Sequence, residues 1–302
     1  MEEGIIGVRD FSKFYLDFAA VKGISFTVQQ GEIFGLLGPN GAGKTTTLEC
    51  LEGLRPADEG EISVMGMNPA RDFPRLVQRI GVQLQTAALP AHITVAEAVR
   101  LFAACHGIAP DMTLLEQMGL AEKLGFQYHA LSTGQKRCLT LALAILHRPP
   151  ILFLDEPTAG LDVNTRITLH QLIRELQQEG TTIILSTHDM AEAETIAHRV
   201  AILLRGQLVA VGVPKELTAG GDGHTKISFR TRDNSLVGAA NGKRQEQLGE
   251  YTVCYTKKPG PLVAQIISRI EAAGDELIDL RVERPSLEER FLELTQYRQE
   301  ER

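Results

Sequence analysis

The chain has 302 residues, a formal net charge of −7, and is 43% hydrophobic and 23% charged. These values are close to those of the average soluble globular protein, and they exclude collagen, a long coiled coil and a wholly disordered chain. At about 150 residues per domain, the length predicts two domains. The acidic balance gives no global positive field that would attract nucleic acid or acidic lipid.

Cysteine usage and hydropathy indicate a reducing compartment and no membrane span. The first ten residues contain no long apolar stretch, so we do not expect a secretory signal. The most apolar window, Leu139–Leu146, is far shorter than the roughly 20 residues that cross a bilayer. The cysteines are scattered and form no C-x-x-C pair, so we expect most of them to be buried free thiols. They are Cys50, Cys105, Cys138 and Cys254.

The first half of the chain predicts strands, a short helix and then a helical region. Short strands and turns are expected over residues 5–38, ending in a buried strand at Glu32–Gly38. A helix is predicted over Lys44–Leu54, and Ile80–Leu84 is a further short apolar run. Residues 95–148 have helical periodicity and are interpreted as an inserted helical subdomain.

The region after residue 150 predicts a parallel sheet. Ile151–Leu154 and Thr182–Leu185 are continuous apolar runs, typical of strands buried on both faces. A helical stripe with i, i+3, i+4, i+7 spacing lies between them, formed by Leu169, Leu172, Ile173 and Leu176. Because strands alternate with helices, the fold class is predicted to be α/β.

A change of composition at Thr218–His224 predicts a linker, with domains over 1–217 and 218–302. The second domain is expected to be small and α+β. Its last helix is predicted to begin with a capping box of Ser286 and Glu289. The predicted elements are strands at Lys226–Arg230 and Tyr251–Thr256, a helix with Val263, Ile266, Ile267 and Ile270, a strand with Ile278, Leu280 and Val282, and a helix with Leu287, Phe291 and Leu294.

A phosphate-binding loop is predicted between the strand at Glu32–Gly38 and the helix that follows it. The loop fits G-x-x-x-x-G-K-[ST] in the strand-to-helix context that this motif requires. Its glycines let backbone N–H groups surround a phosphate, and the helix N-terminus adds a favourable dipole. Lys44 is predicted to reach the β- and γ-phosphates, and the Thr45 hydroxyl to bind Mg²⁺. The predicted phosphate-binding residues are Pro39, Asn40, Gly41, Ala42, Gly43, Lys44, Thr45 and Thr46.

Two carboxylates, Asp155 and Glu156, follow the buried strand that begins at Ile151. Ligands of parallel α/β sheets bind at this carboxyl end of the strands. Asp155 is predicted to hold Mg²⁺, directly or through water, since Mg²⁺ uses few carboxylates and keeps its waters. Glu156 is predicted to be the general base that activates a water molecule. Alone, the pair is equally typical of a solvated loop, and the phosphate-binding loop favours the functional interpretation.

The segment Leu131–Gln135 has two interpretations, and the sequence supports both equally. Ser132 and Gln135 form an S-x-x-Q capping box ahead of an amphipathic helix, which requires no ligand. A helix start with a serine hydroxyl and free N–H groups is also a site for an anion.

Five motifs in this order resemble the nucleotide-binding subunit of an ABC transporter. They are the phosphate-binding loop, Leu131–Gln135, Asp155–Glu156, Ala159–Asp162, and His188 within Ser186–Asp189. The resemblance covers residues 4–215. It implies a P-loop NTPase (RecA-like) core with an inserted helical subdomain, and the binding and hydrolysis of ATP with Mg²⁺.

The resemblance also implies roles for single residues. An aromatic residue near the amino terminus stacks on adenine, and Tyr15 stands at that position with Phe14 as the alternative. A glutamine after the strand at Ile80 contacts Mg²⁺ and water. We assign this role to Gln85 rather than Gln83, because the family usually has residues between the strand and this glutamine.

A site shared by two subunits is implied as well. Each ATP lies between the phosphate-binding loop of one subunit and the Leu-Ser-x-Gly-Gln helix of the other. Ser132 and Gly134 then contact the γ-phosphate across the interface. Gln135, in the same segment, is also expected to be a nucleotide-binding residue. Asp162 helps to organise the partner's site, and His188 holds the γ-phosphate and the attacking water.

The partners implied are a second ATP-binding subunit, expected to form a homodimer with a heterodimer as the alternative, and a separately encoded transmembrane permease. The expected location is cytoplasmic, on the inner face of the cell membrane, and no nucleic acid is expected. The family commonly has glycine where this chain has Thr133. We expect nucleotide binding to survive this difference, and the rate of hydrolysis is left open.

Three functions fit such an ATPase. A DNA-repair or chromosome ATPase requires a long coiled-coil insertion, and a translation-associated ATPase usually has two cassettes. This sequence has no sustained heptad run and one phosphate-binding loop, so transport is favoured over a soluble regulatory or nucleic-acid-linked ATPase. The tail Pro285–Thr295 looks like the ending of exporter-type (ABC-2 type) subunits for drugs, antibiotics or polysaccharides. The tail therefore favours export, and a plain capped amphipathic helix, acting as a regulatory appendage with no bearing on direction, is the alternative.

Overall fold

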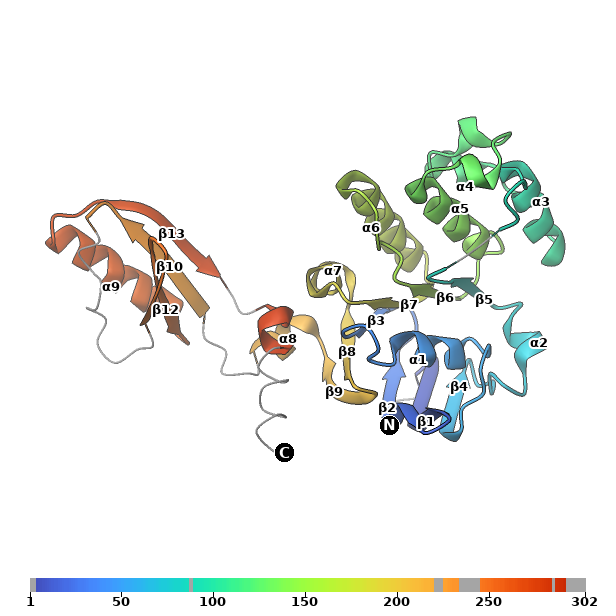
Figure 1. Cartoon of the computed structure of the whole chain (residues 1–302), viewed down its shortest axis with the longest axis horizontal. Helices are drawn as coiled ribbons and strands as arrows, with labels where there is room; N and C mark the ends of the chain where they lie inside the picture. The colour runs from blue at the N-terminus through green and yellow to red at the C-terminus, as the bar shows by residue number, and fades with distance from the viewer. Residues whose placement is uncertain (1–3, 87–88, 220–224, 234–244, 284–285, 292–302) are drawn as a thin grey trace. The chain divides into compact units, whose positions relative to one another are not determined.

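The computed structural model describes residues 4–86, 89–219, 225–233, 245–283 and 286–291. Contacts divide the chain into two compact units, Met1–Val213 and Pro214–Arg302 (Figure 1). The division falls slightly before the boundary predicted after residue 217, because helix α8 (Pro214–Ala219) belongs to the second unit.

A six-stranded sheet forms the centre of the first unit, with strand order β5-β6-β7-β3-β8-β9. Neighbouring strands are parallel except β8 and β9, which are antiparallel. The strands are β3 (Ile33–Leu37), β5 (Ile80–Gln83), β6 (Ile151–Asp155), β7 (Thr182–Thr187), β8 (Arg199–Leu204) and β9 (Gln207–Gly212). Every residue of β3, β6 and β7 is buried, which explains their continuous apolar sequences. The predicted α/β class is confirmed.

Both faces of this sheet are covered (Figure 1). On one face lie α1 (Lys44–Leu51) and an antiparallel sheet of β1 (Ile6–Tyr15), β2 (Phe18–Val28) and β4 (Glu59–Val64). Successive residues of β6 alternate between the two faces, since Phe153 packs on this side and Leu154 on the other. A four-residue helix, α2 (Phe73–Leu76), follows β4.

The second face is covered by helices. They include the inserted subdomain, formed by α3 (Val95–Cys105), α4 (Thr113–Gln117) and α5 (Thr133–Ile145) with two short 3₁₀ turns, and also α6 (Val163–Gln178). The predicted stripe on α6 packs into this cluster through Leu169 and Ile173. Helix α7 (Met190–Ile196) follows β7.

The first helix is shorter than its predicted range of Lys44–Leu54, because α1 ends at Leu51. Glu52 is the C-cap, and Gly53 follows with φ 81°, a left-handed conformation that ends helices and favours glycine.

The second unit contains a four-stranded antiparallel sheet of order β11-β12-β10-β13 with α9 (Pro259–Ala272) packed against it. The strands are β10 (Thr225–Thr231), β11 (Gln245–Leu248), β12 (Tyr251–Thr256) and β13 (Leu277–Glu283). Strand β11 was not predicted, because its sequence QEQL has no apolar alternation. The capping box of Ser286 and Glu289 is present. The predicted Leu294 lies outside the described residues.

Within the described ranges, no helix is long and apolar enough to cross a lipid bilayer. All four cysteines are free thiols. Cys50 and Cys254 are buried and Cys138 is half-buried, as expected for most of them, whereas Cys105 is exposed.

Glu52 is a buried carboxyl group directly behind α1. The residue is 1% exposed, and neither carboxyl oxygen has a hydrogen-bond partner among the described residues. Burial raises the pKa of Glu52 to about 8, and the nearby charges of Asp155 and Glu49 add to the effect. The group is therefore neutral in the folded protein at pH 7.

We predict that the stability of the first unit falls as the pH rises from 5 to 8. The folded state keeps the Glu52 proton up to a pKa of about 8, whereas the unfolded chain releases it near the ordinary value of 4.5. Stability present below the unfolded pKa is thus lost as the pH rises through the folded one, by on the order of 3 to 5 kcal/mol. Urea unfolding at pH 5.5 and 8, without nucleotide, measures this loss.

Glu52→Gln does not titrate and should lose much less stability over this range. The control is Glu61→Gln, which changes an exposed carboxylate in β4 and should retain the wild-type pH dependence. Equal losses in the wild type and in Glu52→Gln would contradict the prediction.

Candidate active site

The loop between β3 and α1 depends on glycine at two positions. Gly38 has φ 153° and Gly43 has φ 103°. A Cβ on Gly38 would lie 2.3 Å from the carbonyl oxygen of Leu203, and one on Gly43 would lie 2.6 Å from that of Ala20. Glycine is therefore required at both positions. Because the N-cap of α1 is Gly43, the cap residue has no side chain to occupy the first N–H groups of the helix.

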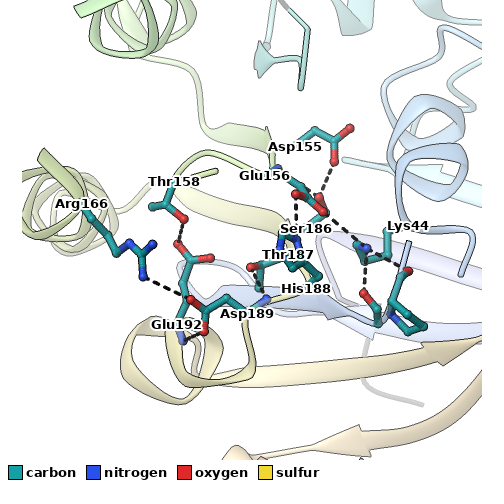
Figure 2. Close-up of polar contacts among 12 residues, drawn as sticks. Lys44, Asp155, Glu156, Thr158, Arg166, Ser186, Thr187, His188, Asp189 and Glu192 are labelled. Carbon is teal, nitrogen blue, oxygen red and sulfur yellow. Dashed lines mark hydrogen bonds and ion pairs between the residues drawn. The ribbon is translucent and has the colours of Figure 1, made fainter. Parts of the chain in front are cut away.

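The Lys44 ammonium connects this loop to the carboxylates of β6 (Figure 2). Its Nζ donates to the carbonyl oxygens of Gly38 at 2.8 Å and Pro39 at 3.2 Å, and it lies 3.6 Å from Glu156 Oε1. The side chain is buried. Burial lowers the pKa of Lys44, while the negative charges of Glu156 and Asp155 act in the opposite direction.

Asp155 and Glu156 are positioned by the pairing of β6 with β7. The register places Asp155 opposite Ser186, whose hydroxyl donates to Asp155 Oδ1. The backbone N–H of Glu156 donates to the Ser186 carbonyl oxygen at 3.2 Å and hydroxyl at 3.1 Å. Glu156 has φ 49°, a strained conformation for a residue with a side chain, and it is buried. Its neighbours hold the carboxylate in place against this strain.

His188 completes the group. Its Nδ1 lies 2.9 Å from Glu156 Oε2, and the side chain is 54% exposed. Glu156 thus bridges Lys44 and His188 (Figure 2). The fold brings together Lys44, Asp155, Glu156 and His188, four residues that are up to 144 positions apart in the sequence.

A second group forms where α5 and α6 begin. The capping box is present, since Ser132 N donates to Gln135 Oε1 at 3.0 Å and Gln135 N donates to Ser132 Oγ at 3.2 Å. A Cβ on Gly134 would lie 3.3 Å from Thr165 Cγ2. Asp162 accepts from the Thr165 N–H at 3.0 Å and hydroxyl at 2.7 Å. The predicted residues Ser132, Gly134, Gln135 and Asp162 are therefore neighbours.

Tyr15 ends β1 beside two basic side chains. The Arg55 guanidinium carbon lies 5.5 Å and the Lys13 ammonium 5.9 Å from the centre of its ring. Arg55 also pairs with Glu49 of α1. Tyr15 is half-buried, and the alternative Phe14 is 40% exposed.

The two candidate glutamines have different surroundings. Gln83 is buried, and its Nε2 donates to the Arg137 carbonyl oxygen at 3.0 Å and to Thr140 Oγ1 at 2.9 Å. Gln85 is exposed. Of the polar contacts among the described residues, none joins Tyr15 or Gln85 to the Lys44 group.

Sequence reasoning missed a buried polar cluster behind Glu156 and His188. It contains Thr158, His170 of α6 and Glu192 of α7. The available signal was a glutamate at the buried face of a short helix, four residues after His188. Its partners are distant in sequence, so their contact could not be inferred.

Comparison with known proteins identifies the family. A model described as ABC transporter matches residues 21–159. The chain is 38% identical over 300 residues to Nod factor export ATP-binding protein I of Burkholderia pseudomallei, and the match covers 96% of each protein. The chain belongs to the ABC transporter ATP-binding proteins. It is also 31% identical over 308 residues to the linearmycin resistance ATP-binding protein of Bacillus subtilis, covering 96% of this chain and 98% of that protein.

Solved structures agree with this assignment. The ATP binding subunit of an ABC transporter has a TM-score of 0.66 at 29% identity, covering 71% of this chain and 92% of that one. A dimeric bacterial ABC transporter cassette has a TM-score of 0.63 at 26% identity, covering 69% of this chain and 98% of that one. The P-loop NTPase fold is confirmed. As a member of this family, the protein binds and hydrolyses ATP. Cassettes of the family dimerise and work with a membrane permease.

Lys44→Met should weaken ATP binding about 10- to 100-fold, because a hydrogen bond to a charged group contributes about 1.5–3 kcal/mol. Fluorescence titration with a labelled ATP analogue measures the affinity. Lys22→Met changes an exposed lysine of β2 and should bind like the wild type. Unchanged affinity in Lys44→Met would contradict the assignment of Lys44 to the phosphates.

Proposed function

We propose that this ABC protein powers export by closing as a homodimer around ATP and Mg²⁺ beneath a separately encoded permease. The observation that carries the proposal is the buried Glu156 carboxylate, which lies between Lys44 and His188 at the edge of the phosphate-binding loop. In this position, the Glu156 carboxylate would act as a proton acceptor beside the groups that would bind the terminal phosphate.

The nucleotide would bind along the loop from Pro39 to Thr46. Backbone N–H groups and the start of α1 surround the phosphates, while the Lys44 ammonium contacts the β- and γ-phosphates. Adenine would stack on the Tyr15 ring. Arg55 and Lys13 already lie against this ring, so Tyr15 offers a supported aromatic surface at the end of β1.

The donor set fits Mg²⁺. Thr45 supplies a hydroxyl, Asp155 a carboxylate and Gln85 an amide oxygen, all hard oxygen ligands. The part of the chain that the structure describes has no cluster of three or more His, Cys, Asp or Glu ligands. One protein carboxylate suits an ion whose remaining ligands are phosphates and water. Bound there, Mg²⁺ would offset the charge of the phosphates.

Hydrolysis would follow from the positions of Glu156, His188 and Lys44. A water oxygen attacks the γ-phosphorus in line with the leaving β-phosphate oxygen. Glu156 accepts the proton of this water, the bond to the β-phosphate oxygen breaks, and ADP and phosphate are released. His188 orients the water and the γ-phosphate, while Lys44 and the helix N-terminus stabilise the developing negative charge.

The second subunit would complete the site. Within one chain, the described polar contacts do not join the group of Ser132, Gly134, Gln135 and Asp162 to the Lys44 group. Two copies facing each other would place the α5 start of one against the phosphate-binding loop of the other. One chain contains both halves, so a homodimer would have two complete sites. Thr133 is exposed at the first position of α5, where a partner's nucleotide would approach.

Export is supported by the names of two relatives, one for Nod factor export and the other for linearmycin resistance. Both are matched over nearly their whole length, including the C-terminal unit. With a permease as partner, the protein would lie on the inner face of the cell membrane. The cargo would be selected mainly by that permease.

Glu156→Gln should bind MgATP but hydrolyse it about 10²- to 10⁴-fold more slowly, since it loses the general base. Light scattering with and without MgATP should then show a stable dimer for the variant and mostly monomer for the wild type. If the wild type hydrolyses ATP and the variant remains monomeric, the proposal that two copies of this chain close around ATP without another protein is wrong. Hydrolysis at the wild-type rate in the variant would reject Glu156 as the base.

Ser132→Arg tests the shared site separately. The large cation at the α5 start should prevent closure onto a partner's nucleotide, so that Glu156→Gln/Ser132→Arg no longer dimerises with MgATP. Binding of a labelled ATP analogue to the monomer should be unchanged within about 3-fold. Arg174→Ala, on an exposed face of α6, serves as a surface control. ATP-dependent dimerisation of the Ser132 variant would contradict the proposed interface.

A further inference from the structure

A buried carboxylate on α7, Glu192, joins three segments behind the candidate active site. Its side chain is 1% exposed. Glu192 Oε1 accepts a hydrogen bond from Thr158 Oγ1 at 2.6 Å and lies 3.0 Å from His170 Nε2 (Figure 2 shows Thr158 and Glu192). Thr158 lies in the turn after β6, His170 is on α6, and all three residues are buried.

A second connection runs beside the first. Asp189 caps α7, since its Oδ1 accepts from the Glu192 N–H at 3.0 Å, and its Oδ2 lies 3.3 Å from Arg166 Nη1 of α6 (Figure 2). This ion pair is partly exposed, so water screens it and it is the weaker link. The first turn of α7 is nevertheless attached to α6 at two points.

These contacts lead directly to residues with proposed roles. Thr158 is two residues after Glu156, and Asp189 is the residue after His188. The N–H of Arg166 donates to the Asp162 carbonyl oxygen at 3.0 Å. The network thus touches the turn after Glu156, the turn after His188 and the start of α6, but not the residues proposed to contact ATP.

Backbone pairing alone does not fix His188 relative to Glu156. The β6–β7 ladder ends at Asp155 opposite Ser186, and Glu156 keeps one further backbone hydrogen bond, to Ser186. On its other side, β7 remains paired with β3 up to Thr187, and His188 is the next residue. Beyond their direct contact, the distance of His188 from Glu156 therefore depends on side-chain contacts that hold the turn after β6 to the turn after β7.

Glu192 is suited to this task because it is held by directed hydrogen bonds. Burial acts to raise the pKa of Glu192, but hydrogen bonds, led by the one from His170, bring the pKa below its ordinary value. Both contacts converge on Oε1, which restricts the carboxylate to few geometries, while Oε2 is buried with no hydrogen-bond partner among the described residues. Small displacements at a reacting centre of about 1 Å can cost about 100-fold in rate.

We propose that Glu192, through Thr158 and His170, is a positioning residue for ATP hydrolysis that fixes the Glu156 turn and the His188 turn relative to each other and to α6. The inference rests on the roles proposed above for Glu156 and His188. A purely structural role would instead alter stability and leave the chemistry of the folded protein unchanged.

Steady-state ATP hydrolysis by the full chain tests this with a matched pair at Thr158. Thr158→Val keeps the shape but loses the hydroxyl, and should lower kcat about 10- to 100-fold with KM for ATP within about 3-fold of wild type. Thr158→Ser keeps the hydroxyl and should restore kcat to within about 3-fold. Glu192→Ala should resemble Thr158→Val, and if it does not fold, the Thr158 pair decides. Glu194→Gln, an exposed change on the same helix, is the control.

A double-mutant cycle separates positioning from a general loss of stability. If Thr158 acts through His188, Thr158→Val should reduce kcat by less than about 3-fold in a His188→Ala background. Unchanged kcat in Thr158→Val, the same fold reduction in both backgrounds, or a change in KM alone would overturn the proposal. Failure of the proposed function is distinct: the wild type would not hydrolyse ATP, or His188→Ala and Glu156→Gln would both retain full activity.

Discussion

The buried Glu156 carboxylate contacts Lys44 on one side and His188 on the other. The arrangement of strands in the first unit must keep these contacts in place. Removing an ion from water costs several kcal/mol unless a partner is held in good geometry. The 3.6 Å and 2.9 Å contacts depend on three strand ends remaining adjacent. A slip of one residue between β6 and β7 would turn Glu156 to the other face of the sheet and leave Lys44 without its carboxylate.

Sheet topology provides this adjacency. Strand β7 lies between β3 and β6, so the loop that carries Lys44 and the turn that carries Glu156 meet on either side of His188. The helical insertion between β5 and β6 leaves this edge of the sheet unchanged and packs on one face. It adds the start of α5, which contacts the start of α6 through Gly134 and Thr165. The first unit thus carries two separate polar groups, one around Lys44 and one at the starts of α5 and α6. Both are positioned by the ends of strands and helices.

Features that depend on neighbouring residues were predictable from the sequence, and those that depend on tertiary contacts were not. The phosphate-binding loop, the buried strand at Ile151 and the capping boxes at Ser132 and Ser286 each follow from a short pattern. The end of α1 could not be predicted from the apolar pattern, because that pattern continues past Gly53. The helix ends before this glycine, where the backbone is left-handed. Strand β11 exists through pairing with β12, not through its own sequence. The Thr158–Glu192 contact spans 34 residues, and no local pattern encodes it.

Charge balance supports the proposal that this site holds a divalent cation. Lys44 contributes one positive charge, and Asp155 and Glu156 contribute two negative ones within the same buried region. The start of α1 adds the equivalent of about half a positive charge. A triphosphate entering such a site would meet a net negative environment, and the low dielectric would strengthen the repulsion. In the proposed mechanism, a cation held by Asp155 and the Thr45 hydroxyl would reverse that sign and leave Glu156 free to accept a proton. The two carboxylates would then have different partners: Asp155 would hold the metal ion, while Glu156 lies against His188.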